Sequence, residues 1–192
     1  MGSDPKNRYD VVMFAITKIT QQYDEFADRM ALSTENAAGD VLVLWLTQRL
    51  ANRLVVTLAH WLEEGLRGRV GDLALSQAQS WEQSVAEARL QPMAPVAASK
   101  ESADALLHSV DITRQTEGFS LTFRWSENRS EVRAEGDEAQ AARMSLSDLE
   151  LRQWLAILYR LFETAHWHQD AWPHWFKPDV TPRGASSGAL LH

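Results

Sequence analysis

Half of the six histidines of this 192-residue chain lie in one short segment, HWHQDAWPHWF, at residues 166–176. Imidazole and carboxylate groups are standard ligands for zinc and similar ions. On a helix, His166 and His168 would point roughly 200° apart, so both could not bind one ion. His166 and Asp170 are four residues apart and would share a face. The spacing therefore allows a metal site of His166, Asp170 and His174, which needs a fourth ligand; the simpler interpretation is a histidine that caps the core.

The same segment holds three of the chain's eight tryptophans. If buried, these rings would close one end of the core, with each indole N–H finding a partner. If exposed, they would form an apolar interface for a protein partner or a second copy. Core closure is the favoured interpretation and the interface is the second. The predicted interface residues are the aromatic anchors Trp167, Trp172, Trp175 and Phe176, with Arg160 and Glu163 on the adjacent exposed face setting specificity.

A second candidate site lies in the glycine-rich stretch GLRGRVGD, residues 65–72. Backbone amides beside Arg67 and Arg69 could hold a phosphate group. However, no Lys-Ser or Lys-Thr pair completes a P-loop. The favoured interpretation is a helix that ends at Gly65, with arginines suited to its negative C-terminus.

Motifs of the common enzyme classes are mostly absent. The chain has no Gly-x-Ser-x-Gly elbow, no His-Glu-x-x-His pair and no cysteine. A net charge of −7 makes nucleic acid an unlikely partner. The longest early apolar run, residues 11–16, is too short for a signal peptide or a membrane span. We expect a cytoplasmic protein without membrane attachment and without a cofactor, apart from the metal of the alternative above.

The first half predicts a hairpin and two helices. A strand near 28–34, a turn at Gly39 and a buried strand at 41–46 form the hairpin. A long amphipathic helix is predicted at 47–65. A second helix, at 73–90, should lie on the outside of the fold and pack through a thin apolar stripe. That stripe consists of Ala74, Ala78, Trp81, Val85 and Ala88.

The second half predicts another hairpin and a third helix. Residues 106–125 alternate in polarity around a turn at Glu117-Gly118. Ser147 and Glu150 form a capping box that begins a helix, and Pro173 should stop that helix near Trp172. Its inward stripe consists of Leu151, Trp154, Leu155, Leu158, Phe162 and Ala165.

The hydrophobic fraction of 45% and charged fraction of 23% are those of a globular protein. We predict an α+β fold of antiparallel hairpins with long amphipathic helices packed on one face, in a hairpin-helix order that occurs twice. Residues 1–176 should form one domain, whose halves 11–90 and 105–176 are joined by a linker at 91–104, and 177–192 a flexible tail. The leading functional hypothesis is a non-enzymatic binding or assembly protein that self-associates; the alternative is a metal-binding protein or metal-dependent enzyme.

Overall fold

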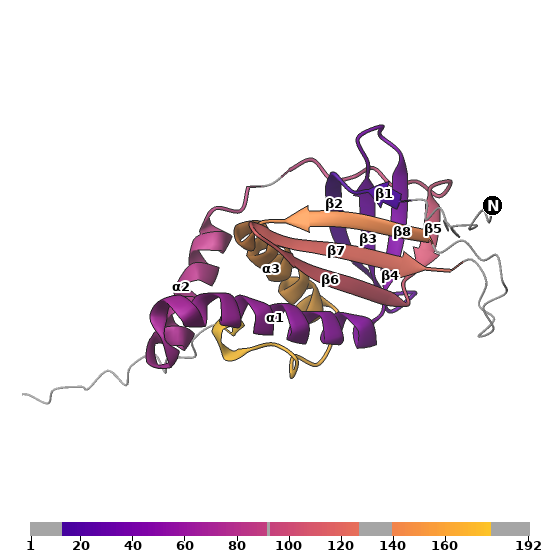
Figure 1. The fold of residues 1–192 in the computed structure, drawn as a ribbon. Helices are drawn as coiled ribbons and strands as arrows, with labels where there is room; N and C mark the ends of the chain where they lie inside the picture. The colour runs from indigo at the N-terminus through magenta and orange to yellow at the C-terminus, as the bar shows by residue number, and fades with distance from the viewer. Residues whose placement is uncertain (1–12, 92, 127–139, 178–192) are drawn as a thin grey trace, which may run out of the picture.

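The computed structural model describes residues 13–91, 93–126 and 140–177. The predicted tail lies outside these residues beyond Lys177. The polar composition after Trp125 predicts an exposed connection as far as Met144, which is wrong for residues 140–144, because they lie in a strand whose Ala141, Ala142 and Met144 are buried. Within them, two four-stranded sheets combine with three helices and a short 3-10 helix, so the α+β class is confirmed (Figure 1).

The strands form two sheets of four. The first sheet runs in the order β1 (Met13–Ala15), β8 (Gln140–Leu146), β7 (Gly118–Trp125) and β6 (Ser109–Gln115). The second sheet runs in the order β2 (Lys18–Asp24), β3 (Arg29–Glu35), β4 (Val41–Leu46) and β5 (Ala103–Leu106). Both predicted hairpins are present, and the turn glycines Gly39 and Gly118 have φ of 88° and 128°. At Gly118 a side chain would also collide with the backbone of Leu146, so this position needs glycine twice over.

Each sheet contains three consecutive strands from one half of the chain and one strand from the other half. β1 pairs in parallel with β8, and β5 pairs in parallel with β4. All other pairings are antiparallel. Both halves therefore have the order strand, three-stranded meander, helix. The strands β1 and β5, which pair with the sheet of the other half, connect the two halves. This exchange was not predicted, because residues 91–104 carry the composition of a linker although β5 begins at Ala103.

The first helix, α1, spans Gln48–Val70 and is longer than predicted. It runs through Gly65 and ends at Gly71, whose φ is 73°. A Cβ at position 65 would lie 2.6 Å from Nη2 of Arg114. The Nη1 of that arginine donates to the carbonyl of Trp61 at 3.1 Å. Gly65 thus makes room for a side chain from β6 and does not end the helix.

The third helix, α3 (Asp148–Thr164), begins as predicted. The hydroxyl of Ser147 accepts from the amide of Glu150, and the carboxylate of Glu150 accepts from the amide of Ser147, which forms the capping box. Every residue of the predicted inward stripe is buried except Ala165, which is half-buried. The sequence therefore gives both the start and the inner face of α3.

The predicted end of α3 near Trp172 is wrong. Behind Thr164 the chain turns at His166, whose φ is 54°. The amide of His166 donates to the carbonyl of Glu163 at 3.1 Å, and that of Trp167 donates to the carbonyl of Phe162 at 3.0 Å. The rings of Phe162 and Trp167 meet edge to face at 5.1 Å. This is a Schellman motif with its usual apolar contact, formed by histidine at a position where glycine is common.

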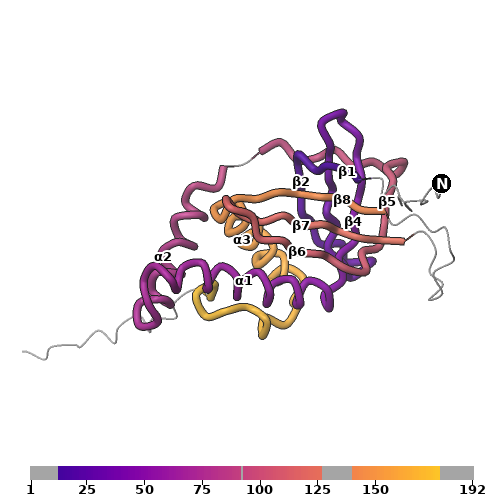
Figure 2. Tube along the Cα trace, viewed as in Figure 1, coloured from indigo at the N-terminus to yellow at the C-terminus, as the bar shows by residue number. Residues whose placement is uncertain are grey.

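One hydrophobic core joins the two halves. It contains Leu32 and Leu44 from the second sheet, Leu121 and Phe123 from the first, and Leu155 from α3. α3 contacts β2 as well as β7 and β8, so it packs against both sheets. Figures 1 and 2 show α3 behind the β6–β8 strands, α1 along the β6 side, and α2 (Asp72–Ala88) at one end. The 3-10 helix η1 (His174–Phe176) packs against α2.

Candidate binding site

The helix α2 is turned the opposite way from the prediction. Its buried side chains are Gln79, Gln83 and Ala86. The predicted inward stripe (Ala74, Ala78, Trp81, Val85 and Ala88) is exposed or half-buried along its whole length. Trp81 is 64% exposed. We call these five residues the outer stripe.

Hydrogen bonds explain why two glutamines occupy the inner face. Nε2 of Gln79 donates to the carbonyl of Leu62 in α1 at 2.9 Å, and its Oε1 accepts from Nη2 of Arg152 in α3 at 2.6 Å. Nε2 of Gln83 donates to the carbonyl of Arg152 at 3.3 Å. A buried polar group is tolerated where it is hydrogen-bonded. The glutamines therefore link α2 to both neighbouring helices.

Arg152 is a charged residue inside this contact. It is 4% exposed, and no ion pair among the described residues includes it. Burial lowers the pKa of its guanidinium, yet arginine keeps its proton in proteins. The guanidinium lies 5.3 Å from the ring centre of Trp175, a cation–π contact that offsets part of the cost of burying the charge. Its Nη1 has no acceptor among the described residues.

The four predicted aromatic anchors are buried, as the core-closure interpretation predicts, but Nε1 of Trp172 has no acceptor among the described residues, so the expectation of a partner for each indole N–H is wrong there. Their exposed fractions are 7% for Trp167, 3% for Trp172, and 7% for both Trp175 and Phe176. They therefore offer no exposed apolar patch in this structure.

Two of the indoles are fixed by carboxylates from distant parts of the chain. Nε1 of Trp175 donates to Glu63 of α1 at 2.8 Å, and that of Trp167 donates to Asp28 of the β2–β3 turn at 2.9 Å. The hydrogen bonds from Trp167 and then from Tyr23 hold the pKa of Asp28 below its ordinary value. The segment after α3 is thus attached at both ends.

The metal candidates are not brought together. α3 ends before His166, so the shared helical face expected for His166 and Asp170 does not exist. Both residues and His174 are exposed. Among the described residues, no group of three or more His, Asp or Glu side chains is placed to hold a metal ion.

The phosphate candidate also lacks the predicted loop. Residues 65–70 belong to α1, so their backbone amides face along a helix and cannot cradle an anion. Nε of Arg67 pairs with Asp72 at 2.9 Å. Arg69 is exposed beside it.

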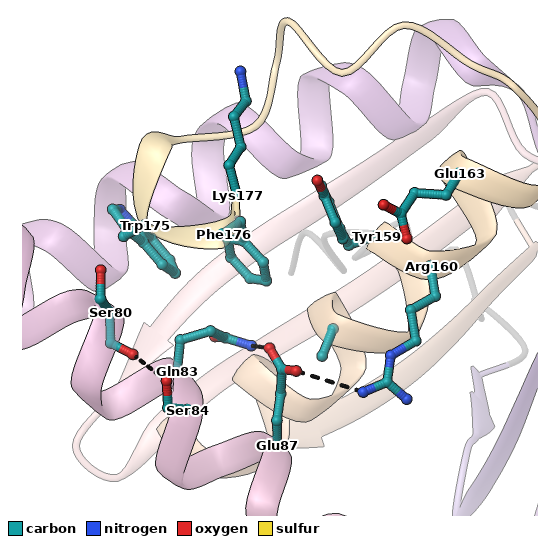
Figure 3. A pocket seen from close by; sticks show the side chains of 11 residues that line it. Ser80, Gln83, Ser84, Glu87, Tyr159, Arg160, Glu163, Trp175, Phe176 and Lys177 are labelled. Atoms are coloured by element: carbon teal, nitrogen blue, oxygen red, sulfur yellow. Dashed lines mark hydrogen bonds and ion pairs between the residues drawn. The ribbon is translucent and has the colours of Figure 1, made fainter. Parts of the chain in front are cut away.

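A pocket of about 350 Å³ opens between α2, α3 and η1 (Figure 3). Trp175, Phe176 and Lys177 line it from η1 and the residue after η1, and Tyr159 and Glu163 line it from α3, with the rings of Tyr159 and Phe176 in contact at a centre-to-centre distance of 6.0 Å. The remaining lining residues are Ser80, Gln83, Ser84, Glu87, Ala156 and Arg160. Arg160 and Glu163, predicted as exposed residues that set specificity, therefore share this pocket.

A chain of polar contacts crosses the pocket. Nε2 of Gln83 donates to Oε1 of Glu87 at 3.1 Å, and Nη2 of Arg160 lies 3.4 Å from Oε2 of the same carboxylate (Figure 3). The hydroxyl of Tyr159 donates to Gln169 at 3.1 Å, and burial raises its pKa. The arrangement offers hydrogen bonds and aromatic faces, and it contains no nucleophile paired with a base.

The sequence analysis did not predict the buried contact of Gln79, Gln83 and Arg152, nor the pocket that Gln83 lines. A signal was present in the 3.6-residue period: Leu75, Gln79, Gln83 and Ala86 share one side of the helix. This side was not predicted to be the inner face because it carries two glutamines, and glutamine side chains are mostly exposed.

Comparisons with known proteins give no identity for the chain: no family model, no curated protein and no solved structure matches it. In the part of the chain that the structure describes, no helix is both long and apolar enough to cross a membrane.

Proposed function

We propose that this chain is a non-enzymatic binding and assembly protein that self-associates through the outer stripe of α2. The observation that carries the proposal is the orientation of that helix: two glutamines point inward while Trp81 and Val85 point outward. Exposed tryptophan is a frequent anchor of protein interfaces. The aromatic anchors predicted after α3 are buried, so the proposed interface lies on the neighbouring helix α2.

The spacing of the outer stripe fits a helix as its partner. Its residues follow each other at intervals of four, three, four and three, which is the seam of a helix pair. Three of the five are alanines, so another helix can approach closely beside Trp81. A helix lying in such a seam buries apolar side chains that are now in water.

The charges around α2 favour a second copy in antiparallel orientation. The whole chain is acidic, so two copies repel unless they meet on uncharged surface. Residues 73–81 contain no charged side chain. Arg67 and Arg69 lie just before α2, which begins at Asp72, whereas Glu82 and Glu87 occupy its second half and Arg89 follows it. Antiparallel pairing about a two-fold axis places the basic end of one copy near the acidic half of the other.

Light scattering over a range of protein concentrations tests the proposal. The wild-type chain should approach twice the mass of one chain, whereas Trp81→Ser should stay near the mass of one chain. The matched control is Phe26→Ser, because Phe26 is 104% exposed in the β2–β3 turn, away from α2. A single-chain mass for the wild type at every concentration, or an unchanged larger mass for Trp81→Ser, contradicts the proposed self-association.

A further inference from the structure

We infer that the pocket between α2, α3 and η1 binds an organic cation, a guanidinium or a primary ammonium group. This inference concerns a different surface from the outer stripe and holds whether or not two copies associate. It rests on the unused hydrogen-bond acceptors of the pocket, its aromatic faces and the placement of its own basic side chains.

The first unused acceptor is the side-chain oxygen of Gln83. Both partners of its amide nitrogen, Oε1 of Glu87 and the carbonyl of Arg152, are acceptors, so the nitrogen must face them and the oxygen must face elsewhere. Gln83 is 3% exposed and lines the pocket, and its Oε1 has no donor among the described residues. A buried acceptor without a donor is unfavourable. The oxygen is enclosed, so a donor group on a ligand would satisfy it after the side chain shifts toward the pocket that it lines.

Two carboxylates, those of Glu87 and Glu163, add negative charge to the lining of the pocket. Glu163 is exposed at the pocket, and no ion pair among the described residues includes it. Glu87 is partly engaged, since its contact with Arg160 is long at 3.4 Å. Two serine hydroxyls, at positions 80 and 84, also line the pocket and can accept hydrogen bonds. Together these groups suit a ligand that is rich in donors.

Aromatic rings supply the second element of cation recognition. Tyr159 and Phe176 lie with their ring centres 6.0 Å apart and an interplanar angle of 32°. Both line the pocket, and cations bind over such ring faces. The two rings are only 9% and 7% exposed and also pack against Trp172, so a planar guanidinium can contact them only from the open side of the pocket, where its N–H groups can reach carboxylate oxygens.

The basic residues nearby engage Glu87 and leave Glu163 without an ion pair among the described residues. Arg160 is turned toward Glu87, and the ammonium of Lys177 points away from the other lining side chains in Figure 3. The guanidinium of Arg152 does not line the pocket and lies over the ring of Trp175. An anion would have to displace Glu87 from Arg160 and approach two carboxylates, so the pocket favours a cation.

Calorimetric titration of the full chain with N-acetyl-arginine amide tests the inference, because this probe carries one guanidinium and no other charge. N-acetyl-citrulline amide is its neutral counterpart of nearly equal shape. We expect saturable binding of the arginine probe and binding at least about tenfold weaker for the citrulline probe, since the hydrogen bonds to carboxylate lose their charge assistance. Equal binding of the two probes, no binding of the arginine probe, or tighter binding of N-acetyl-aspartate amide overturns the inference.

The variant Glu163→Gln locates the site. Glu163 is exposed, so this change should leave folding intact while weakening the arginine probe by about tenfold. Glu25→Gln is the matched control, because Glu25 is exposed in the β2–β3 turn away from the pocket. Unchanged binding by Glu163→Gln would overturn the assignment to this pocket.

Two further titrants separate the sources of the cation. Agmatine represents a free small molecule, and a Gly-Arg-Gly peptide with blocked ends represents a basic side chain of a protein. Tighter binding of agmatine supports a metabolite site, and tighter binding of the peptide supports a protein ligand; failure of both contradicts the inference. Trp81→Ser should bind the arginine probe like wild type, so a failure of self-association is distinguishable from a failure of this site.

Discussion

Helices α2 and α3 are both 17 residues long and pack against each other, yet they use their apolar residues in opposite ways. In α3 the apolar stripe faces the core and Leu155 is fully buried. In α2 the apolar stripe faces outward, while Gln79 and Gln83 face the same interior. Apolar residues at a period of 3.6 therefore predict a helix, but the groups of the adjacent elements determine which side of that helix faces the core. Leu62 and Arg152 offer polar groups there, so glutamines fit.

The largest expected effect lies in α3. Leu155→Ala removes a side chain with 0% exposure from the centre of the core. Large-to-small changes at such sites lower the free energy of unfolding by about 2–5 kcal/mol. Urea unfolding followed by tryptophan fluorescence measures this change. A loss below about 1 kcal/mol would mean that α3 is packed no better than the outside of α2.

The next largest effect should come from the polar contact between the two helices. Arg152→Met keeps much of the length of the side chain but leaves Oε1 of Gln79 without its donor. An unsatisfied buried acceptor costs about 1–3 kcal/mol of unfolding free energy. The double variant Arg152→Met with Gln79→Met removes both partners and should recover part of that loss.

Additive losses in this double-mutant cycle would contradict the coupling between Gln79 and Arg152. The same urea unfolding experiment provides all four values of the cycle. Arg160→Met is a suitable control, since Arg160 is exposed and its contact with Glu87 is long, and exposed ion pairs contribute little.

A smaller effect, visible mainly as pH dependence, is expected at the attachment of the segment after α3. Hydrogen bonds from Trp167 and Tyr23 lower the pKa of Asp28 in the folded state below its ordinary 3.8. The unfolded chain then takes up the proton first as the pH falls, so this contribution to stability is present above the unfolded pKa and is lost in acid.

Asp28→Asn tests that contribution and keeps the positive φ of 47°, which asparagine tolerates. Between about pH 6 and about pH 3, the variant should lose less unfolding free energy than wild type. Equal pH slopes for the two proteins would show that these hydrogen bonds do not shift the titration of Asp28.

The smallest effect on folding should come from the outer stripe. Trp81→Ser should change the unfolding free energy of a single chain by less than about 0.5 kcal/mol, because surface changes away from special contacts usually do. Dilute protein should be used, so that association does not contribute to stability. A loss comparable to that of Leu155→Ala would mean that Trp81 packs against its own chain.

Local signals predicted much of the fold. The second hairpin followed from alternating polarity around a glycine turn, and the first followed from a short apolar run after the turn at Gly39. The start of α3 followed from Ser147 and Glu150. These features depend on residues close in sequence, so one chain is enough to read them. The buried aromatic cluster was predicted as core closure, because an amphipathic helix end with three tryptophans usually packs inward.

The remaining features depend on contacts between distant residues. Gly65 lies inside α1, where the lack of a side chain leaves room for Arg114 of β6. The helix α3 ends early, and Trp167 folds back onto Phe162. The inward side of α2 depends on Arg152, which lies 73 residues away from Gln79. The pocket follows from that orientation, so the sequence predicted Arg160, Glu163, Trp175 and Phe176 as site residues without placing them in one pocket.

The outer stripe can be examined most directly by thiol labelling, because the chain has no cysteine and an introduced one is read without background. Ala74→Cys places a thiol on the outer stripe, and Ala38→Cys places one in the β3–β4 turn; both alanines are exposed. Self-association predicts that maleimide labels position 74 several-fold more slowly in concentrated than in dilute protein, that position 38 is unaffected, and that Trp81→Ser abolishes the protection. Labelling of position 74 at the same rate at every concentration would contradict the account.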